Sequence, residues 1–292
     1  MSRTIRGVLW MAGAALCFSA SIGLVRHLSD TMSTFEIVFL RQLLGALVMI
    51  PWLWRAGLGA LRTRVLPLHC ARAAVSYLGM ATSYYSVTLI PLADAVSLQF
   101  TSPLWVALLA MVFLGESVGI NRWGAIALGF IGVLVIMRPG FAEIGIGMLI
   151  ALSAALFYAG GDITVRALSR TDSIPVIMFY GYILQLPLAV VPAALTWTTP
   201  GWDVAPALIA FVAVALGAQY CMTVSLSIAD ASLVTPVLFM RLPFVAAIGF
   251  VFFAQTPDNW TWVGAAIILS STYVLARWER SGGDGEHDRK SD

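Results

Sequence analysis

The sequence predicts an all-α membrane protein in which ten transmembrane helices form two inverted five-helix repeats around a central cavity. Three observations lead to this fold class. The 292 residues are 60% hydrophobic and only 11% charged, with a mean hydropathy of +0.88, which is more apolar surface than a soluble domain buries. The apolar residues form continuous runs of about twenty, the length of a helix that crosses roughly 30 Å of hydrocarbon. The second half of the chain also resembles the first half at one constant spacing.

Each span follows from an apolar run that is bounded by loop residues. Runs of this length exclude a β-barrel, whose strands alternate apolar and polar residues in segments of about ten. The first run has the basic flank of a signal peptide, but it continues to Val25 and has a mate in the repeat, so we assign it as a span. In chain order the spans lie at roughly 7–26, 34–54, 69–89, 94–114, 121–138, 144–165, 174–195, 204–226, 231–254 and 260–277.

The positive charges predict the orientation, because Arg and Lys concentrate in cytoplasmic loops. With the N-terminus inside, only Arg26 and Arg138 fall outside. We therefore expect a multi-pass protein of the bacterial cytoplasmic (inner) membrane with both termini in the cytoplasm. The cytoplasmic set is Arg3, Arg6, Arg55, Arg62, Arg64, Arg122, Arg166, Arg170, Arg277, Arg280, Arg289 and Lys290.

The internal repeat predicts the domain organisation. Residues 7–29 align with residues 147–169, with Gly, the AAL triplet and V-R-x-L-S in register, and Pro103 aligns with Pro243. We expect a first repeat at 1–140, a second at 141–280 and a disordered, charged, Gly-rich tail at 281–292. Because each half has an odd number of spans, the second half enters the membrane inverted. Inverted repeats build a central site that opens to each face in turn.

The run from 89 to 140 carries a family resemblance. Its marks are Pro103, the pair Gly115-Glu116, and Arg138-Pro139-Gly140 at the end of the fifth span. This run resembles the C-terminal part of an EamA repeat of the drug/metabolite transporter superfamily. The second copy departs from the pattern, since Gln255-Thr256 stand where Gly-Glu is usual. The resemblance implies ten helices in two inverted halves around a substrate cavity, and it implies no particular substrate.

Two arginines lie deep in predicted spans. At 1.5 Å per residue, Arg41 is roughly 10 Å from the outer end of its span and Arg241 is about 15 Å from either end. A charge at this depth is costly unless it faces protein or water. Two interpretations stay open: a buried structural ion pair or helix cap, or a guanidinium that holds a substrate carboxylate or phosphate. Pro243 must disturb the helix next to Arg241, and transporter sites form at interrupted helices.

Polar and aromatic residues in several spans complete the predicted site. A single aromatic residue in a span usually packs or lies at the membrane interface, but a set on several helices fits a pocket for a flat or amphipathic solute. Asp162 is of intermediate depth and shares a helical face with Arg166. The candidate substrate-binding residues are Arg41, Arg241, Tyr77, Tyr84, Gln99, Trp105, Tyr158, Asp162, Tyr180 and Gln219.

Several classes are excluded or disfavoured by what the sequence lacks. The net charge of +2, without a basic patch, excludes nucleic acid as a partner. Cys17, Cys70 and Cys221 have no metal-ligand spacing, and we expect no metal and no cofactor. The sequence contains no catalytic motif of a membrane-embedded enzyme and no filter loop of a channel. The expected partners are a small organic substrate and the lipid bilayer, in a monomer or homodimer.

These observations together predict a secondary transporter (permease) that works by alternating access. The deep arginines favour a zwitterionic or anionic solute, such as an amino-acid-like compound or a metallophore, and we expect export, although these residues do not encode the direction. The alternative is import of a vitamin or nucleoside-like metabolite of the riboflavin or S-adenosylmethionine class. Since only Asp162 is a moderately deep carboxylate, we expect exchange, facilitated movement or weak coupling rather than obligatory proton symport.

Overall fold

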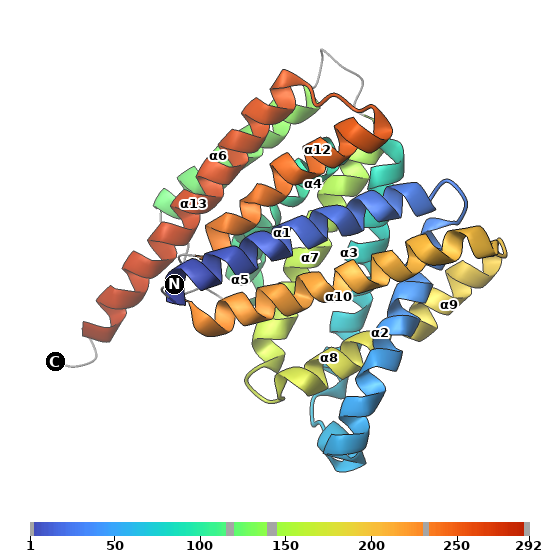
Figure 1. The fold of residues 1–292 in the computed structure, drawn as a ribbon. Coiled ribbons are helices and arrows are strands. Elements are labelled where there is room, and N and C mark those ends of the chain that lie inside the picture. The colour runs from blue at the N-terminus through green and yellow to red at the C-terminus, as the bar shows by residue number, and fades with distance from the viewer. Residues whose placement is uncertain (1–2, 115–119, 139–144, 230–233, 289–292) are drawn as a thin grey trace.

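A computed structural model describes residues 3–114, 120–138, 145–229 and 234–288 of the chain, so Gly115 and Glu116 lie outside the described residues. Within these ranges the regular elements are helices (Figure 1). They are, in chain order, α1 (Arg3–Leu28), α2 (Thr34–Ala56), η1 (Leu58–Leu61), α3 (Leu66–Leu89), α4 (Leu92–Gln99), α5 (Ser102–Leu114), α6 (Ile120–Met137), α7 (Ile146–Leu168), α8 (Ile174–Ile183), α9 (Gln185–Leu195), η2 (Trp202–Val204), α10 (Ala205–Ile228), η3 (Thr235–Met240), α12 (Arg241–Phe253) and α13 (Asn259–Asp288).

Long apolar stretches confirm the all-helical membrane class. Helix lies in each of the ten predicted ranges. By length and hydropathy, six stretches of the described chain can cross a membrane, and two shorter apolar helices accompany them. The number of ten crossings therefore stays a prediction. The six stretches are Ile5–Leu28, Thr34–Arg55, Leu92–Val112, Ile146–Leu168, Ile174–Leu195 and Trp202–Ile228, and the shorter helices are Trp123–Met137 and Val237–Phe253.

Three predicted spans are interrupted rather than continuous. A proline ring inside a helix clashes with the carbonyl of the residue four positions earlier. The prolines at 103, 187 and 243 place that clash at 99, 183 and 239. Accordingly α4 ends at Gln99, α8 ends at Ile183, and the 3-10 turn η3 gives way to α12 at Arg241. The expected disturbance beside Pro243 is therefore present, and it lies on the N-terminal side of Arg241.

The turns after the first helix of each repeat have the same backbone hydrogen bonds. Ser29 N–H donates to the Val25 carbonyl at 2.9 Å, and Ser169 N–H donates to the Val165 carbonyl at 2.9 Å. The next bonds of each turn also correspond when the two repeats are aligned. The aligned stretches of the two repeats thus fold into the same turn.

The contacts between helices also correspond in the two repeats, and they build two bundles. One bundle contains α1, α10, η3 and α12, and the other contains α7, α3, α4 and α5. Each bundle joins the first helix of one repeat to the third and fourth helices of the other. Figure 1 shows α1 lying along α10, the α6–α13 pair along one edge, and the start of α1 on the same side of the molecule as the end of α13.

The C-terminal tail corrects one expectation. We expected disorder from 281, but α13 continues to Asp288. Adding residues to an existing helix is much easier than nucleating a new one, and no proline interrupts the sequence between 277 and 288. The charged, Gly-rich composition is therefore compatible with a helical extension of the last span.

The α6–α13 pair crosses where two glycines face each other. A Cβ added to Gly132 would lie 2.8 Å from the backbone oxygen of Gly264, and a Cβ on Gly264 would lie 2.7 Å from the oxygen of Gly132. Small residues allow this close approach of helix backbones in a membrane. The Gly- and Ala-rich fifth and tenth spans therefore serve helix packing, as the sequence predicts.

We expect Gly132→Ala to lower the melting temperature of the purified protein, because a backbone oxygen cannot rotate away from the new methyl group. Overpacking of this kind costs about 1–3 kcal/mol. Gly124→Ala on the same helix is the matched control, since an added Cβ there meets nothing within 4 Å. Equal melting temperatures for the two variants would contradict the close crossing.

Candidate functional site

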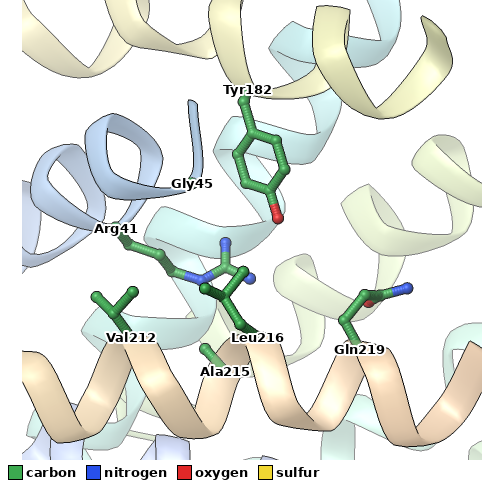
Figure 2. A pocket seen from close by; sticks show the side chains of 7 residues that line it. All are labelled: Arg41, Gly45, Tyr182, Val212, Ala215, Leu216 and Gln219. Carbon is green, nitrogen blue, oxygen red and sulfur yellow. The ribbon is translucent and has the colours of Figure 1, made fainter. Parts of the chain in front are cut away.

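A small cavity surrounds the side chain of Arg41. Its volume is about 20 Å³, which is room for roughly one water molecule. In Figure 2 the guanidinium of Arg41 and the hydroxyl of Tyr182 point toward each other across it. The cavity lies between α2, α8 and α10, and its lining residues are Arg41, Gly45, Tyr182, Val212, Ala215, Leu216 and Gln219.

Arg41 has only weak hydrogen-bond partners. Its Nη1 donates to the Sδ of Met80 at 2.7 Å and to the Oε1 of Gln42 at 3.3 Å. Its buried Nε has no partner in the part of the chain that the structure describes. A thioether is a weak acceptor and a neutral amide does not compensate charge. The guanidinium is therefore left with unused donors and an unneutralised charge.

Arg241 lies at the junction of η3 and α12, where the helix changes from 3-10 to α. The Oγ of Ser19 on α1 donates to the backbone oxygen of Arg241 at 3.1 Å, which fixes the junction against that helix. The guanidinium carbon lies 5.7 Å from the centre of the Phe18 ring. Its buried Nε also has no partner among the described residues.

Three tyrosines connect the two arginines. Tyr84 and Tyr158 interact electrostatically with both guanidinium groups, and Tyr182 interacts with that of Arg41. We name these five residues the arginine–tyrosine cluster. They come from α2, α12, α3, α7 and α8, so the cluster lies between the two bundles. The fold thus brings together four of the ten predicted site residues: Arg41, Arg241, Tyr84 and Tyr158.

The cluster has no acidic partner within the described part of the chain. The ion pairs there are His69–Asp172 and Arg138–Asp258, near helix ends. A guanidinium does not lose its proton in a protein, and an unpaired buried charge costs several kcal/mol. The sequence left open a structural ion pair for Arg41 and Arg241. Residues 3–114, 120–138, 145–229 and 234–288 contain no acidic side chain that forms such a pair with either arginine.

Three predicted site residues lie in helix-packing positions instead. Gln99 donates from Nε2 to the Oγ of Ser83 at 2.9 Å. The Trp105 ring meets the Phe130 ring edge-on, with 5.0 Å between the ring centres. Tyr77 is buried on α3, and within the described residues its hydroxyl has no partner.

Three further predicted residues lie in different places, and only one of them lines the cavity. Gln219 lines the cavity beside Arg41. Tyr180 donates its hydroxyl proton to the backbone oxygen of Leu61 at 2.7 Å, so it points away from the cavity. Asp162 is exposed on α7, and its charged neighbours are Arg166 and Arg72.

Tyr182 is the residue of the cluster that we did not predict from the sequence. It follows Tyr180 by two residues, which places it about 200° around the helix on the opposite face. The sequence feature that could have indicated an aromatic neighbour here is Gly45, which lies one turn after Arg41 and leaves space for a ring. A Cβ on Gly45 would collide with the Cε1 atom of Tyr182, so a larger residue would displace the tyrosine.

Polar contacts hold one end of the molecule closed. Glu36, which is fully buried, accepts hydrogen bonds from the backbone N–H of Thr198 at 2.6 Å and from the Thr198 hydroxyl at 3.0 Å. It also accepts one from the backbone N–H of Ser33 at 2.6 Å. These contacts join the α1–α2 turn to the segment after α9. We name them the Glu36 closure.

A second carboxylate holds the other end. Asp172 in the α7–α8 turn accepts hydrogen bonds from the Oγ1 of Thr63 at 2.8 Å and the Nε2 of His69 at 2.9 Å. Burial raises the pKa of Asp172, but the hydrogen bonds from His69 and Thr63 outweigh it, so the pKa lies below its usual value. We name these contacts the Asp172 closure. With both ends joined, the central cavity stays small.

A helical membrane protein with unpaired cations between two bundles, and a closure at each end, has the architecture of a solute transporter. The profile of the EamA-like transporter family matches residues 5–138 and again residues 145–277. The chain belongs to the EamA-like transporter family. This confirms the resemblance and the general function that the sequence predicts: transport of a small molecule across a membrane.

Relatives of established function span nearly the whole chain. A riboflavin transporter of Rhizobium johnstonii is 31% identical over 95% of this chain and 93% of its own. An S-adenosylmethionine uptake transporter of Rickettsia felis is 26% identical over 97% of both chains. The pseudopaline exporter CntI of Pseudomonas aeruginosa is 29% identical over 94% of this chain and 97% of its own. A solved crystal structure shares the fold with a TM-score of 0.61 at 18% identity, covering 92% of this chain and 96% of that one.

We expect the Asp172 closure to weaken in acid. Because the pKa of Asp172 is lower in the folded protein, its stabilising contribution is complete above the unfolded pKa and is lost as pH falls through the folded pKa. The melting-temperature gap between wild type and Asp172→Asn should therefore stay constant above about pH 5 and shrink as the pH falls below about 4. Asp30→Asn, an exposed site on the equivalent turn, is the control. A gap that stays constant or widens in acid would contradict this assignment.

Proposed function

We propose that the chain is a secondary transporter that moves an anionic or zwitterionic organic solute by alternating access. The observation that carries the proposal is the pair of partly buried guanidinium groups in the arginine–tyrosine cluster, whose Nε atoms are unsatisfied and which have no acidic partner among the described residues. A solute carboxylate or phosphate would supply the missing charge and hydrogen-bond acceptors. Gln219 and Tyr182 line the same cavity and would contact the body of the solute.

The proposed architecture has ten crossings in two inverted halves, 1–140 and 141–280, with both termini in the cytoplasm. The repeated turn hydrogen bonds and the repeated helix pairs support two equivalent halves. The two matches of the family profile have the same division. In this orientation the Glu36 closure is outside and the Asp172 closure is inside. Alternating access then consists of opening one closure while the other stays shut.

The proposed direction is export, with a solute such as an amino-acid-like compound or a metallophore. The pseudopaline exporter among the relatives supports this direction. Import of a riboflavin- or S-adenosylmethionine-like metabolite is the second candidate, which the other relatives favour. Comparing metabolites in cells and medium, with and without the protein, reveals the solute and its direction together.

The names of the family and these relatives denote transport rather than catalysis. A monomer or a homodimer is the proposed assembly.

We expect Arg41→Gln and Arg241→Gln to abolish the transport-dependent metabolite change while expression is retained. Removing an unpaired buried cation relieves its desolvation cost, so the melting temperature should stay the same or rise. Arg55→Gln, at the exposed end of α2, is the control and should transport normally. If both central variants instead lose about 3–5 kcal/mol of stability, as breaking a buried ion pair does, the arginines are structural.

We also expect that proton coupling through Asp162 is not required. Asp162 has Arg166 and Arg72 as charged neighbours, and it is not among the electrostatic neighbours of Arg41 or Arg241. A pH gradient imposed on proteoliposomes should therefore drive similar solute movement in wild type and Asp162→Asn. Uphill accumulation that depends on the gradient and disappears in Asp162→Asn would show that the carrier is a proton symporter using this residue.

A further inference from the structure

The charge of the arginine–tyrosine cluster can be counted. Arg41 and Arg241 each carry one positive charge that cannot titrate. The electrostatic neighbours of Arg41 are Tyr84, Tyr182 and Tyr158, and those of Arg241 are Tyr158 and Tyr84. Tyrosine side chains are uncharged at neutral pH. The cluster therefore has a net charge of two positive units.

No described acidic side chain can offset this charge, because none lies within ion-pair distance of either guanidinium. The acidic residues of the undescribed internal segments, Glu116, Glu143 and Asp230, come after the ends of α5, α6 and α10 in the sequence. By sequence position they fall between helices, whereas Arg41 and Arg241 lie within predicted spans. Within residues 3–114, 120–138, 145–229 and 234–288, therefore, no side chain supplies the compensating charge at ion-pair distance.

The two arginines also break the symmetry of the repeat. In the alignment of the two halves, Arg41 corresponds to Gly181 and Arg241 corresponds to Thr101, both uncharged. A charge needed to build the repeated fold would be expected in both halves. Each arginine is instead present once, although the helix pairs of the two halves correspond. This pattern fits recognition of an asymmetric ligand rather than a role in packing.

We infer that the substrate is a dianion with a flat ring system, either a phosphate monoester or a dicarboxylate. This inference rests on the proposed transport function and narrows its substrate class. A phosphate monoester carries about −1.5 to −2 charges near pH 7, and guanidinium groups bind phosphate and carboxylate with paired hydrogen bonds. The rings of Tyr84, Tyr158 and Tyr182 provide the surface for a flat body. A neutral or cationic solute would leave at least one arginine uncompensated.

Matched ligands that differ in charge test the inference. The protein in nanodiscs of zwitterionic phosphatidylcholine is titrated with three pairs: riboflavin 5′-phosphate and riboflavin, adenosine 5′-monophosphate and adenosine, phthalate and phthalamide. A hydrogen-bonded charge contributes about 1.5–3 kcal/mol. We therefore expect at least one dianion to bind about 10- to 100-fold tighter than its neutral partner. Arg41→Gln and Arg241→Gln should each remove most of that preference, and Arg55→Gln should keep it.

The inference is overturned if no dianion binds tighter than its neutral partner, or if the arginine variants weaken both members of a pair equally. Transport is measured separately by the metabolite comparison between cells and medium. If that comparison shows transport while the dianions show no preference, the substrate class is wrong and the transport function stands. If dianions bind in the expected way but no solute moves, the binding site stands and the proposed direction and mechanism fail.

Discussion

An arginine inside a membrane protein keeps its charge, and the centre of this molecule is organised around two of them. Burial of a charge costs several kcal/mol unless a partner compensates it. The chain supplies tyrosine rings, a thioether and an amide around Arg41, none of which carries a negative charge. The surrounding helices must therefore hold the guanidinium groups in place without neutralising them. On the function that we propose, an entering anion would supply the missing negative charge.

Prolines provide the geometry that places one of these charges. Inside hydrocarbon every backbone polar group needs a partner within the protein, so interrupted helices occur where protein covers them. The breaks at 100–101 and at 240–241 correspond in the alignment of the two repeats. At one, Ser19 on α1 satisfies the carbonyl of Arg241. At the other, the Phe100 ring meets Phe239 edge-on, with 5.4 Å between the ring centres. The two interrupted segments thus pack against each other beside the cluster.

The two closures have the same arrangement of hydrogen bonds at opposite ends of the molecule. In each, a carboxylate from one repeat accepts hydrogen bonds from the other repeat: Glu36 from Thr198, and Asp172 from Thr63 and His69. Hydrogen bonds to a charged acceptor are strong, but water can replace them at a protein surface. Such contacts are suited to forming and breaking repeatedly. Between them, the small central volume separates the two sides of the molecule.

The sequence by itself determined the membrane class and the presence of helix in the ten ranges, because the length of an apolar run depends only on local geometry. The depth of Arg41 and Arg241 in the membrane stays a prediction. The sequence also predicted the disturbed helix beside Pro243. It did not determine that Tyr182 rather than Tyr180 faces Arg41, that Gln99 and Trp105 contact Ser83 and Phe130, or that α13 continues to Asp288. The rotation of each helix about its axis is fixed by side chains from distant parts of the chain, and only the tertiary structure brings these together.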